Sequence, residues 1–165
     1  MSRTRTGWLF VAVQVMLLIA LVFFPTGTDW PMPGWLRALC LILIAAGAVI
    51  VVGAGLWLGR ALTPTPVPNG RGRLRTDGPY RFVRHPIYTG VLAIVVGITV
   101  GTRSWLGLAL GVLTLAFFSV KARWEEARLT ETFADYPQYA RATPRFVPFL
   151  PMPGGRAPSG SPPAP

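Results

Sequence analysis

The chain has 165 residues, of which 52% are hydrophobic and 13% charged, and its formal net charge is +10. A soluble domain of this length would not collect its apolar residues into long blocks, so the composition indicates a membrane protein. The positive charge alone would suit nucleic acid, but the sequence has neither a soluble basic face nor a recognisable nucleic-acid-binding module. We therefore expect no nucleic-acid partner.

Two long apolar stretches occupy the first third of the chain. Residues 8–24 are interrupted only by Gln14, and residues 35–58 carry one charge, Arg37, near their start. As helices, both are expected to cross the roughly 30 Å of hydrocarbon in a bilayer. A cleaved secretory signal is the alternative for the first stretch, but that stretch is too long and no small-residue cleavage site follows it.

Two shorter apolar stretches come after a polar segment. Residues 63–72 contain three prolines and two glycines, which predicts an extended cytoplasmic loop. Residues 87–101 and 105–120 are separated by a turn-like sequence at 102–104, so we expect a tight helical hairpin. The hairpin is slightly short for a bilayer unless flanking residues extend it.

The last part of the chain is more polar. Trp124 and Phe133 mark a loose apolar face, as expected of an amphipathic helix that emerges from the membrane, and Pro137 is expected to end or break that helix. Residues 151–165 consist largely of proline, glycine, serine and alanine without an apolar period, which predicts a disordered tail.

The basic residues are distributed unevenly between the loops. Four spans place three basic groups on one side of the membrane, while the loops of the other side carry only Arg37 and Arg103. The positive-inside rule then puts both termini in the cytoplasm. The sequence thus predicts an all-α integral membrane bundle of four transmembrane helices plus a cytoplasmic C-terminal amphipathic helix. We expect a single domain over residues 1–150, with its chemistry in residues 72–150.

The chemically useful side chains are concentrated in residues 71–88 and 121–139. Because the hairpin returns both segments to one membrane face, we expect them to meet. They would combine His85, the only histidine, with two carboxylates, several cations and aromatic rings, a set that suits a polar ligand with a flat ring and a charged end. One histidine and one cysteine argue against a zinc site. The plain alternatives are lipid-phosphate contacts, interface aromatics and a solvated helix face.

Two motifs resemble those of a known family. The first is Gly78-x-Tyr80-Arg81-x-x-Arg84-His85-Pro86-x-Tyr88-x-Gly90, and the second, two helices later, is Glu125-Glu126-x-x-Leu129-x-x-x-Phe133 with residues 139–144. Together they resemble the isoprenylcysteine carboxyl methyltransferase and phospholipid methyltransferase superfamily over about residues 72–150. The resemblance implies an integral membrane enzyme that uses S-adenosylmethionine and has no Rossmann domain.

The resemblance also implies where the sites lie. By position, the cofactor site falls on Gly72, Arg73, Leu74, Arg75, Tyr80, His85, Pro86, Ile87, Tyr88 and Glu125. The substrate-side cation is Lys121, where the carboxyl methyltransferase branch has an arginine that grips a carboxylate with two parallel hydrogen bonds. Residues 133–136 also depart from the family pattern, which leaves the placement of Tyr136 and Tyr139 open.

The chemistry of methyl transfer agrees with this assignment. A sulfonium donor and an anionic acceptor cancel their charges in the transition state, so a site shielded from water lowers the barrier. A carboxylate acceptor needs only an orienting cation, for which Lys121, Arg84 and Arg123 are candidates. An amine acceptor must first lose a proton, and His85 or Glu126 is then the candidate base.

We therefore predict methyl transfer to a lipophilic acceptor at the cytoplasmic membrane face, in a site open sideways to lipid. Carboxyl methylation of an isoprenylcysteine-like substrate is the first choice, and N-methylation of a phospholipid amine is the second. Prenylated cysteine, phospholipid and a small isoprenoid all stay open as acceptors. A membrane reductase of the sterol type, which would bind NADPH, and a non-catalytic helical membrane protein are the alternatives from other classes.

Overall fold

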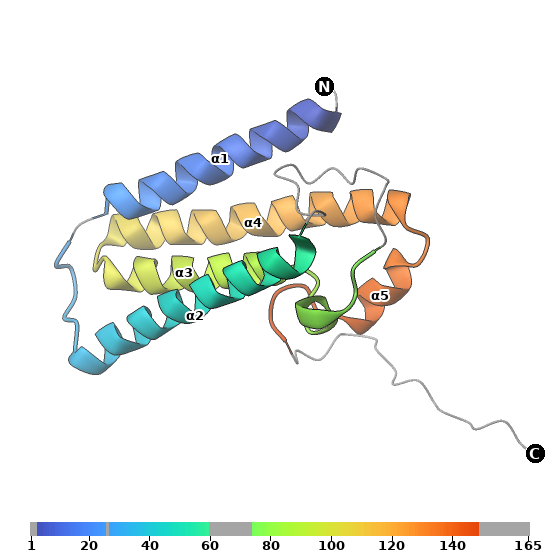
Figure 1. Cartoon of the computed structure of the whole chain (residues 1–165). Coiled ribbons are helices and arrows are strands. Elements are labelled where there is room, and N and C mark those ends of the chain that lie inside the picture. The colour runs from blue at the N-terminus through green and yellow to red at the C-terminus, as the bar shows by residue number, and fades with distance from the viewer. Residues whose placement is uncertain (1–2, 26, 60–73, 149–165) are drawn as a thin grey trace, which may run out of the picture.

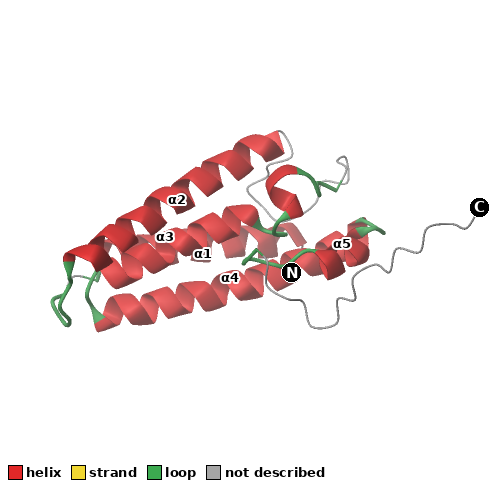
Figure 2. Ribbon diagram, turned by 90° about the horizontal axis from the view of Figure 1, so that it is seen from below, coloured by secondary structure: helices red, strands yellow, loops and turns green. Residues whose placement is uncertain are grey.

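The computed structural model of the protein describes residues 3–25, 27–59 and 74–148, and every regular element in these ranges is helical (Figures 1 and 2). This confirms the all-α prediction for the described part of the chain. The predicted loop at 63–72 and the predicted tail at 151–165 lie outside these ranges. In chain order the elements are α1 (Arg3–Phe23), α2 (Gly34–Leu58), the 3₁₀ helix η2 (Gly78–Arg81), α3 (Pro86–Gly101), α4 (Trp105–Thr132) and α5 (Tyr136–Ala142).

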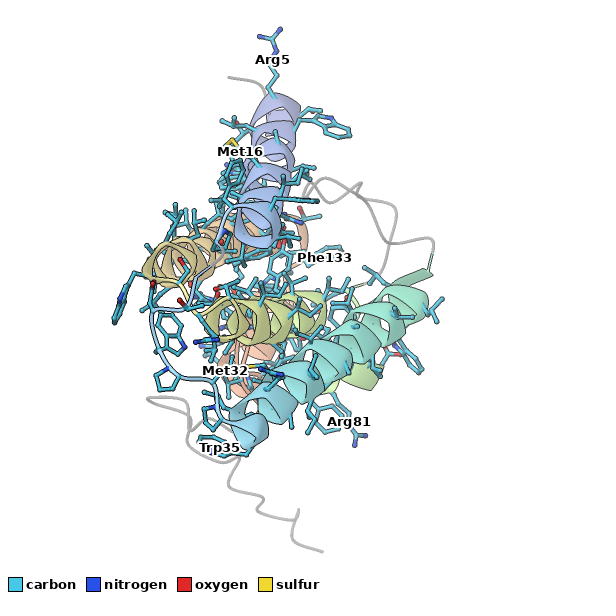
Figure 3. The ribbon with its side chains drawn as sticks, turned by 90° about the vertical axis from the view of Figure 1, so that its left-hand side faces the viewer. Arg5, Met16, Met32, Trp35, Arg81 and Phe133 are labelled. Atoms are coloured by element: carbon cyan, nitrogen blue, oxygen red, sulfur yellow. The ribbon has the colours of Figure 1, made fainter. Side chains whose placement is uncertain are left out.

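Three of these helices, α1, α2 and α4, are long and apolar enough to cross a membrane. Apolar side chains project outward from α1 and α2 (Figure 3), and Met16 and Trp35 are 61% and 69% exposed. Such faces suit lipid and not water. The remaining expected span, residues 87–101, corresponds to α3, which is apolar but has only 16 residues.

The helix α4 corrects one expectation about the C-terminal part. It continues without interruption to Thr132, so the amphipathic segment after residue 120 is the last part of α4 and not a separate helix. The prediction that Pro137 ends this helix is wrong. The chain leaves the helix at Phe133, which adopts an extended conformation, and Pro137 lies in the first turn of α5. Proline is tolerated there because the first helical N–H groups have no partner within the helix.

Glycines bring α2 and α3 into close contact. A Cβ atom built on Gly47 would lie 2.5 Å from the carbonyl oxygen of Gly90, and one built on Gly90 would lie 2.6 Å from that of Gly47. Only glycine permits such an approach of two helix backbones, which is a common way to pack helices in lipid. Gly97 packs similarly against Cys40, with 2.8 Å from its virtual Cβ to the Cys40 carbonyl oxygen.

At one end of the bundle, the loop between α1 and α2 is fastened to the turn between α3 and α4. The Nε of Arg103 donates a hydrogen bond to the Trp30 carbonyl oxygen at 2.7 Å, and the backbone N–H of Trp105 donates to a carboxylate oxygen of Asp29 at 2.8 Å. Arg103 has φ of 54°, a left-handed conformation that turns the chain sharply. The chemically rich segments lie at the opposite end of the bundle (Figure 1).

Candidate functional site

The candidate site begins where α3 begins. Pro86 is the first residue of α3 and His85 is its N-cap, in a conformation with φ of −127° and ψ of 65°. Proline has no N–H to lose at this position and its fixed φ suits the first turn. His85 is only 9% exposed, so this helix start holds the imidazole inside the protein.

The chain after α5 folds back beside this helix start. Residues 144–146 provide three backbone carbonyl acceptors, each within hydrogen-bonding distance of the Arg84–Thr89 segment. The pairs are Arg84 N to Pro144 O at 2.8 Å, His85 N to Arg145 O at 3.2 Å and Thr89 Oγ1 to Phe146 O at 2.7 Å. Residues 144–146 lie beyond the predicted segment 121–139. The predicted segments 71–88 and 121–139 are themselves in contact through His85 and Glu126.

Glu126 lies at the centre of an ionic cluster. Its carboxylate accepts hydrogen bonds from Nε and Nη2 of Arg145 at 2.9 and 2.5 Å, and Nη1 of Arg84 is 3.2 Å from Oε1. The Nε2 of His85 lies 3.2 Å from the same Oε1. Two guanidinium groups thus compensate one largely buried carboxylate, and the two-point contact with Arg145 also fixes its orientation.

The neighbouring Glu125 has a different environment. It accepts a hydrogen bond from the hydroxyl of Tyr88, and its other oxygen is 3.5 Å from Nδ1 of His85. Within the described residues, no lysine or arginine nitrogen lies within 4.0 Å of this carboxylate. Glu125 therefore has negative charge available for a cationic ligand, although only 14% of its side chain is exposed.

Lys121 lies one helical turn before Glu125 and is 4% exposed. Its Nζ donates a hydrogen bond to Oε1 of Gln14 at 2.5 Å and is 5.2 Å from the ring centre of Tyr88. The described part of the chain places no carboxylate within 4.0 Å of this ammonium group. A neutral amide and aromatic faces stabilise its charge without cancelling it.

Aromatic rings form one wall of the site. The rings of His85 and Tyr88 are stacked, with centroids 5.3 Å apart and an interplanar angle of 6°. Phe146 flanks His85 at 5.9 Å, and Phe118 meets Tyr88 edge to face at 5.0 Å. Tyr88 links the two charged residues of this part of the site, since its hydroxyl contacts Glu125 and its ring lies beside the Lys121 ammonium group.

Three further tyrosines border the site. The hydroxyl of Tyr139 donates a hydrogen bond to the carbonyl oxygen of Tyr80 at 2.6 Å, which ties α5 to η2. Burial and then the nearby Glu125 carboxylate raise the pKa of Tyr80 to about 12. Burial also raises the pKa of Tyr136 to about 12, followed by the effect of Glu126. These phenols are therefore neutral hydrogen-bonding groups at physiological pH.

The structure brings together seven of the sequence-predicted site residues, namely Tyr80, Arg84, His85, Tyr88, Lys121, Glu125 and Glu126. Pro86 and Ile87 form the first turn of α3 behind them. Arg75 instead makes an exposed contact of 3.7 Å with Asp77, and Arg123 is exposed. Leu74 is partly buried, while Gly72 and Arg73 lie outside the described residues.

Of the site residues that were not predicted, two contact its charged groups through polar atoms, Gln14 and Arg145. Gln14 had a signal in the sequence, because it is the only polar residue in an apolar run, and a polar side chain within a membrane span usually has a functional or packing partner. Arg145 had no such signal. It follows Pro144 in an irregular segment, so only the tertiary fold shows that it holds Glu126.

Comparisons with known proteins place this arrangement in a family. Residues 35–136 match the phospholipid methyltransferase family. A nickel-cobalt-cadmium resistance protein of Alcaligenes xylosoxydans xylosoxydans is 33% identical over 155 residues, which cover 91% of this chain and 67% of that protein. Protein-S-isoprenylcysteine O-methyltransferase B of Arabidopsis thaliana is 30% identical over 148 residues, covering 86% of this chain and 73% of the plant protein.

The match to the methyltransferases is also found in yeast. The protein-S-isoprenylcysteine O-methyltransferase of Schizosaccharomyces pombe is 38% identical over 80 residues, which cover 47% of this chain and 34% of the yeast protein. The chain spans about two thirds of the length of the resistance protein. The match over residues 35–136 and the similarity to these relatives show that the chain belongs to the phospholipid methyltransferase family, within the superfamily that includes the isoprenylcysteine carboxyl methyltransferases.

Proposed function

We propose that the protein transfers a methyl group from S-adenosylmethionine to the carboxylate of a lipophilic, isoprenylcysteine-like acceptor. The observation that carries this proposal is a pair of opposite charges one turn apart on α4. Among the described residues, Glu125 has no lysine or arginine nitrogen within 4.0 Å, and Lys121 has no carboxylate oxygen within 4.0 Å. A cationic methyl donor beside Glu125 would give that carboxylate an opposite charge, and an anionic acceptor beside Lys121 would do the same for the ammonium group.

The residues around Glu125 fit the proposed cofactor. S-adenosylmethionine, when bound, supplies an electrophilic methyl group on a positively charged sulfur. Glu125 offers the negative charge, while the rings of Tyr80, His85 and Tyr88 offer flat surfaces and polar groups for the adenosine part. We assign the remaining contacts to Gly72, Arg73, Leu74, Arg75, Pro86 and Ile87.

The acceptor side depends on Lys121. A single ammonium group is enough to orient a carboxylate that is already ionised, because no proton has to leave before the attack. Its burial keeps water away, which strengthens the attraction between the approaching charges. Glu126 contacts His85 and Arg145, and Arg84 contacts Glu126, so we assign positioning roles to Arg84 and Glu126.

An amine acceptor is less favoured by this geometry. It requires a base, and the two candidate bases are both engaged. Both ring nitrogens of His85 face carboxylate oxygens, at 3.5 Å for Glu125 and 3.2 Å for Glu126. Glu126 is itself bound by two guanidinium groups, which stabilise its ionised form and weaken it as a base.

We further propose that the protein crosses the membrane four times, with both termini and the site on the cytoplasmic face. In this topology α3 is the third of the four spans, and the residues that flank it, up to His85 on one side and Arg103 on the other, compensate for its short length. The described basic residues support the orientation, since most belong to segments at the end of the bundle that carries the site (Figure 1). A site entrance that opens sideways to lipid would admit the acceptor chain.

The test is a binding and transfer assay on the full chain purified in detergent. Saturable binding of S-adenosylmethionine, with no binding of NADPH, is the expected result. Glu125→Gln should weaken that binding about tenfold or more, because a buried charge contact is lost. Glu131→Gln is the matched control on the exposed part of α4 and should leave the affinity unchanged.

The second step of the test uses a labelled methyl donor. N-acetyl-S-farnesylcysteine should become labelled in a base-labile ester, whereas phosphatidylethanolamine should not. Binding of NADPH in place of S-adenosylmethionine would instead assign the protein to the reductase class. Absence of saturable S-adenosylmethionine binding would overturn the proposal.

A further inference from the structure

Gln14 is the polar member of the α1 face that packs against α4. This face follows spacings of three and four residues, and α1 is anchored in it by Leu17 and Leu21, which are 7% and 0% exposed. A polar side chain in such a position needs a partner, because hydrocarbon offers none. The partner of Gln14 is Lys121, at 2.5 Å from amide oxygen to ammonium nitrogen.

The choice of a neutral partner has a consequence for Lys121. Arg84 and Arg145 both contact the Glu126 carboxylate, so their charges are compensated within the protein. Gln14 contributes only a carbonyl dipole, so it does not neutralise the Lys121 ammonium group as a carboxylate would, in a setting where water is scarce. An ammonium group has three donors, of which Gln14 takes one. The others are available to a ligand.

The surroundings of this pair are aromatic. Phe10 lies one turn before Gln14 on α1, and its ring centre is 5.9 Å from that of Phe117 and 5.4 Å from that of Trp124 on α4. All three rings are partly exposed. Towards its N-terminus α1 leans away from the other helices (Figure 1).

We propose that the α1–α4 seam, formed by Phe10, Gln14, Phe117, Lys121 and Trp124, binds an anionic lipophilic acceptor, and that Gln14 positions the Lys121 ammonium group for its anionic end. The inference rests on the proposed function and deepens it. The aromatic rings contact the apolar chain, and the ammonium group receives the carboxylate. A glutamate in place of Gln14 would occupy the same space but cancel the charge on which binding depends.

The experiment compares two probes of equal shape and different charge, N-acetyl-S-farnesylcysteine and its carboxamide, on the full chain in detergent. The wild-type protein should bind the acid at least about tenfold more tightly than the amide, as expected for a charge-assisted contact. Gln14→Glu should abolish this preference. Gln14→Leu should reduce it and raise the acceptor KM while kcat changes little. Ala12→Leu, on the exposed side of α1, should change nothing.

A double-mutant cycle isolates the pair. In a Lys121→Met background, Gln14→Glu should have no further effect on the preference for the acid, because there is no ammonium group left to neutralise. Competition with lysophosphatidylglycerol checks the choice of anion. This lipid should not displace the farnesylated acid, and displacement with the same dependence on Gln14 would assign the seam to a phosphodiester head group and overturn the assignment to the carboxylate. An unchanged acid preference in Gln14→Glu would overturn the inference.

Binding of the methyl donor separates this inference from the proposed function. All Gln14 variants should bind S-adenosylmethionine with wild-type affinity, which also shows that they are folded. A protein that binds no S-adenosylmethionine, yet prefers the acid in a Gln14-dependent way, would refute the function and support the seam. If the Gln14→Glu variant methylates the acid as well as the wild type does, the proposed function is supported and the role of the seam is refuted.

Discussion

The Tyr88 hydroxyl donates a hydrogen bond to Glu125, and the same ring lies under the ammonium group of Lys121, 5.2 Å from ring centre to nitrogen. One side chain thus touches both the proposed donor site and the proposed acceptor site. Its hydroxyl and its ring are expected to serve different ligands, and substitutions can remove them one at a time.

Tyr88→Phe removes the hydroxyl and keeps the ring. Because Glu125 loses a hydrogen bond that fixes its carboxylate, the affinity for S-adenosylmethionine should fall about tenfold, while the acceptor KM stays near the wild-type value. Tyr88→Leu removes the ring as well and should also raise the acceptor KM. Isothermal titration with the donor and steady-state kinetics with the acceptor measure the two effects. Equal donor affinity in Tyr88→Phe and the wild type would contradict this role.

The two ion pairs of Glu126 with Arg145 and of Glu131 with Arg128 should differ in their contribution to stability. Arg145→Met breaks a two-point contact with a largely buried carboxylate, and we expect a loss of about 1–3 kcal/mol in the free energy of unfolding. Arg128→Met breaks an exposed pair and should cost less than about 1 kcal/mol. Thermal unfolding of both variants in the same detergent checks the order. A larger loss in Arg128→Met would be inconsistent with the structure.

The close contact of α2 with α3 predicts a steep effect of side-chain size. Gly47→Leu forces a side chain against the Gly90 carbonyl, so we expect a destabilisation of about 1–3 kcal/mol or failure to form the bundle. Gly53→Leu is the matched control in α2, because a Cβ there would meet nothing within 4 Å. Thermal melting curves and gel filtration of the two variants should differ clearly. Similar stability of both would show that the two backbones do not approach as described.

The tyrosines predict how stability changes at high pH. The pKa values of Tyr80 and Tyr136 are raised to about 12 in the folded protein, whereas an unfolded tyrosine titrates near 10. The unfolded chain therefore loses these protons first, and the free energy of unfolding should decrease as the pH rises from about 10 to about 12. Absorbance of phenolate at 295 nm is the measurement. Its appearance near pH 10 while the helices are still folded would contradict the burial of these rings.

The sequence was sufficient for the parts of the fold that depend on apolar periodicity and local signals. The boundaries of α2 and the position of Pro86 at the start of α3 agree with what the apolar runs and the proline predict. The chain also turns after Asp77, at a Gly-Pro sequence typical of turns, with a hydrogen bond from Tyr80 N to Asp77 O at 3.1 Å. Because the hairpin of α3 and α4 returns the chain to the same end of the bundle, the contact of His85 with Glu126 also follows from the order of the helices.

The remaining features depend on tertiary contacts that produce no periodic pattern in the sequence. The sequence underestimates the length of α4 beyond residue 120. The polar residues there resemble the start of a new helix, whereas the same helix continues into more polar surroundings. The contact between Gly47 and Gly90 joins two helices far apart in the chain, and spacing within one helix does not identify the pair. Arg145 is similar, since its role depends on how the chain returns after α5.

The unbroken course of α4 couples the proposed chemistry to the thickness of the bilayer. Trp105 and Glu126 belong to one rigid rod, so the height of the reacting groups above the hydrocarbon is set by how the helix tilts to match it. In a thinner membrane Lys121 would lie closer to the aqueous phase, and in a thicker membrane it would lie deeper in the hydrocarbon region. Turnover in nanodiscs should therefore pass through an optimum as the lipid acyl chains are lengthened, although no residue of the site has changed.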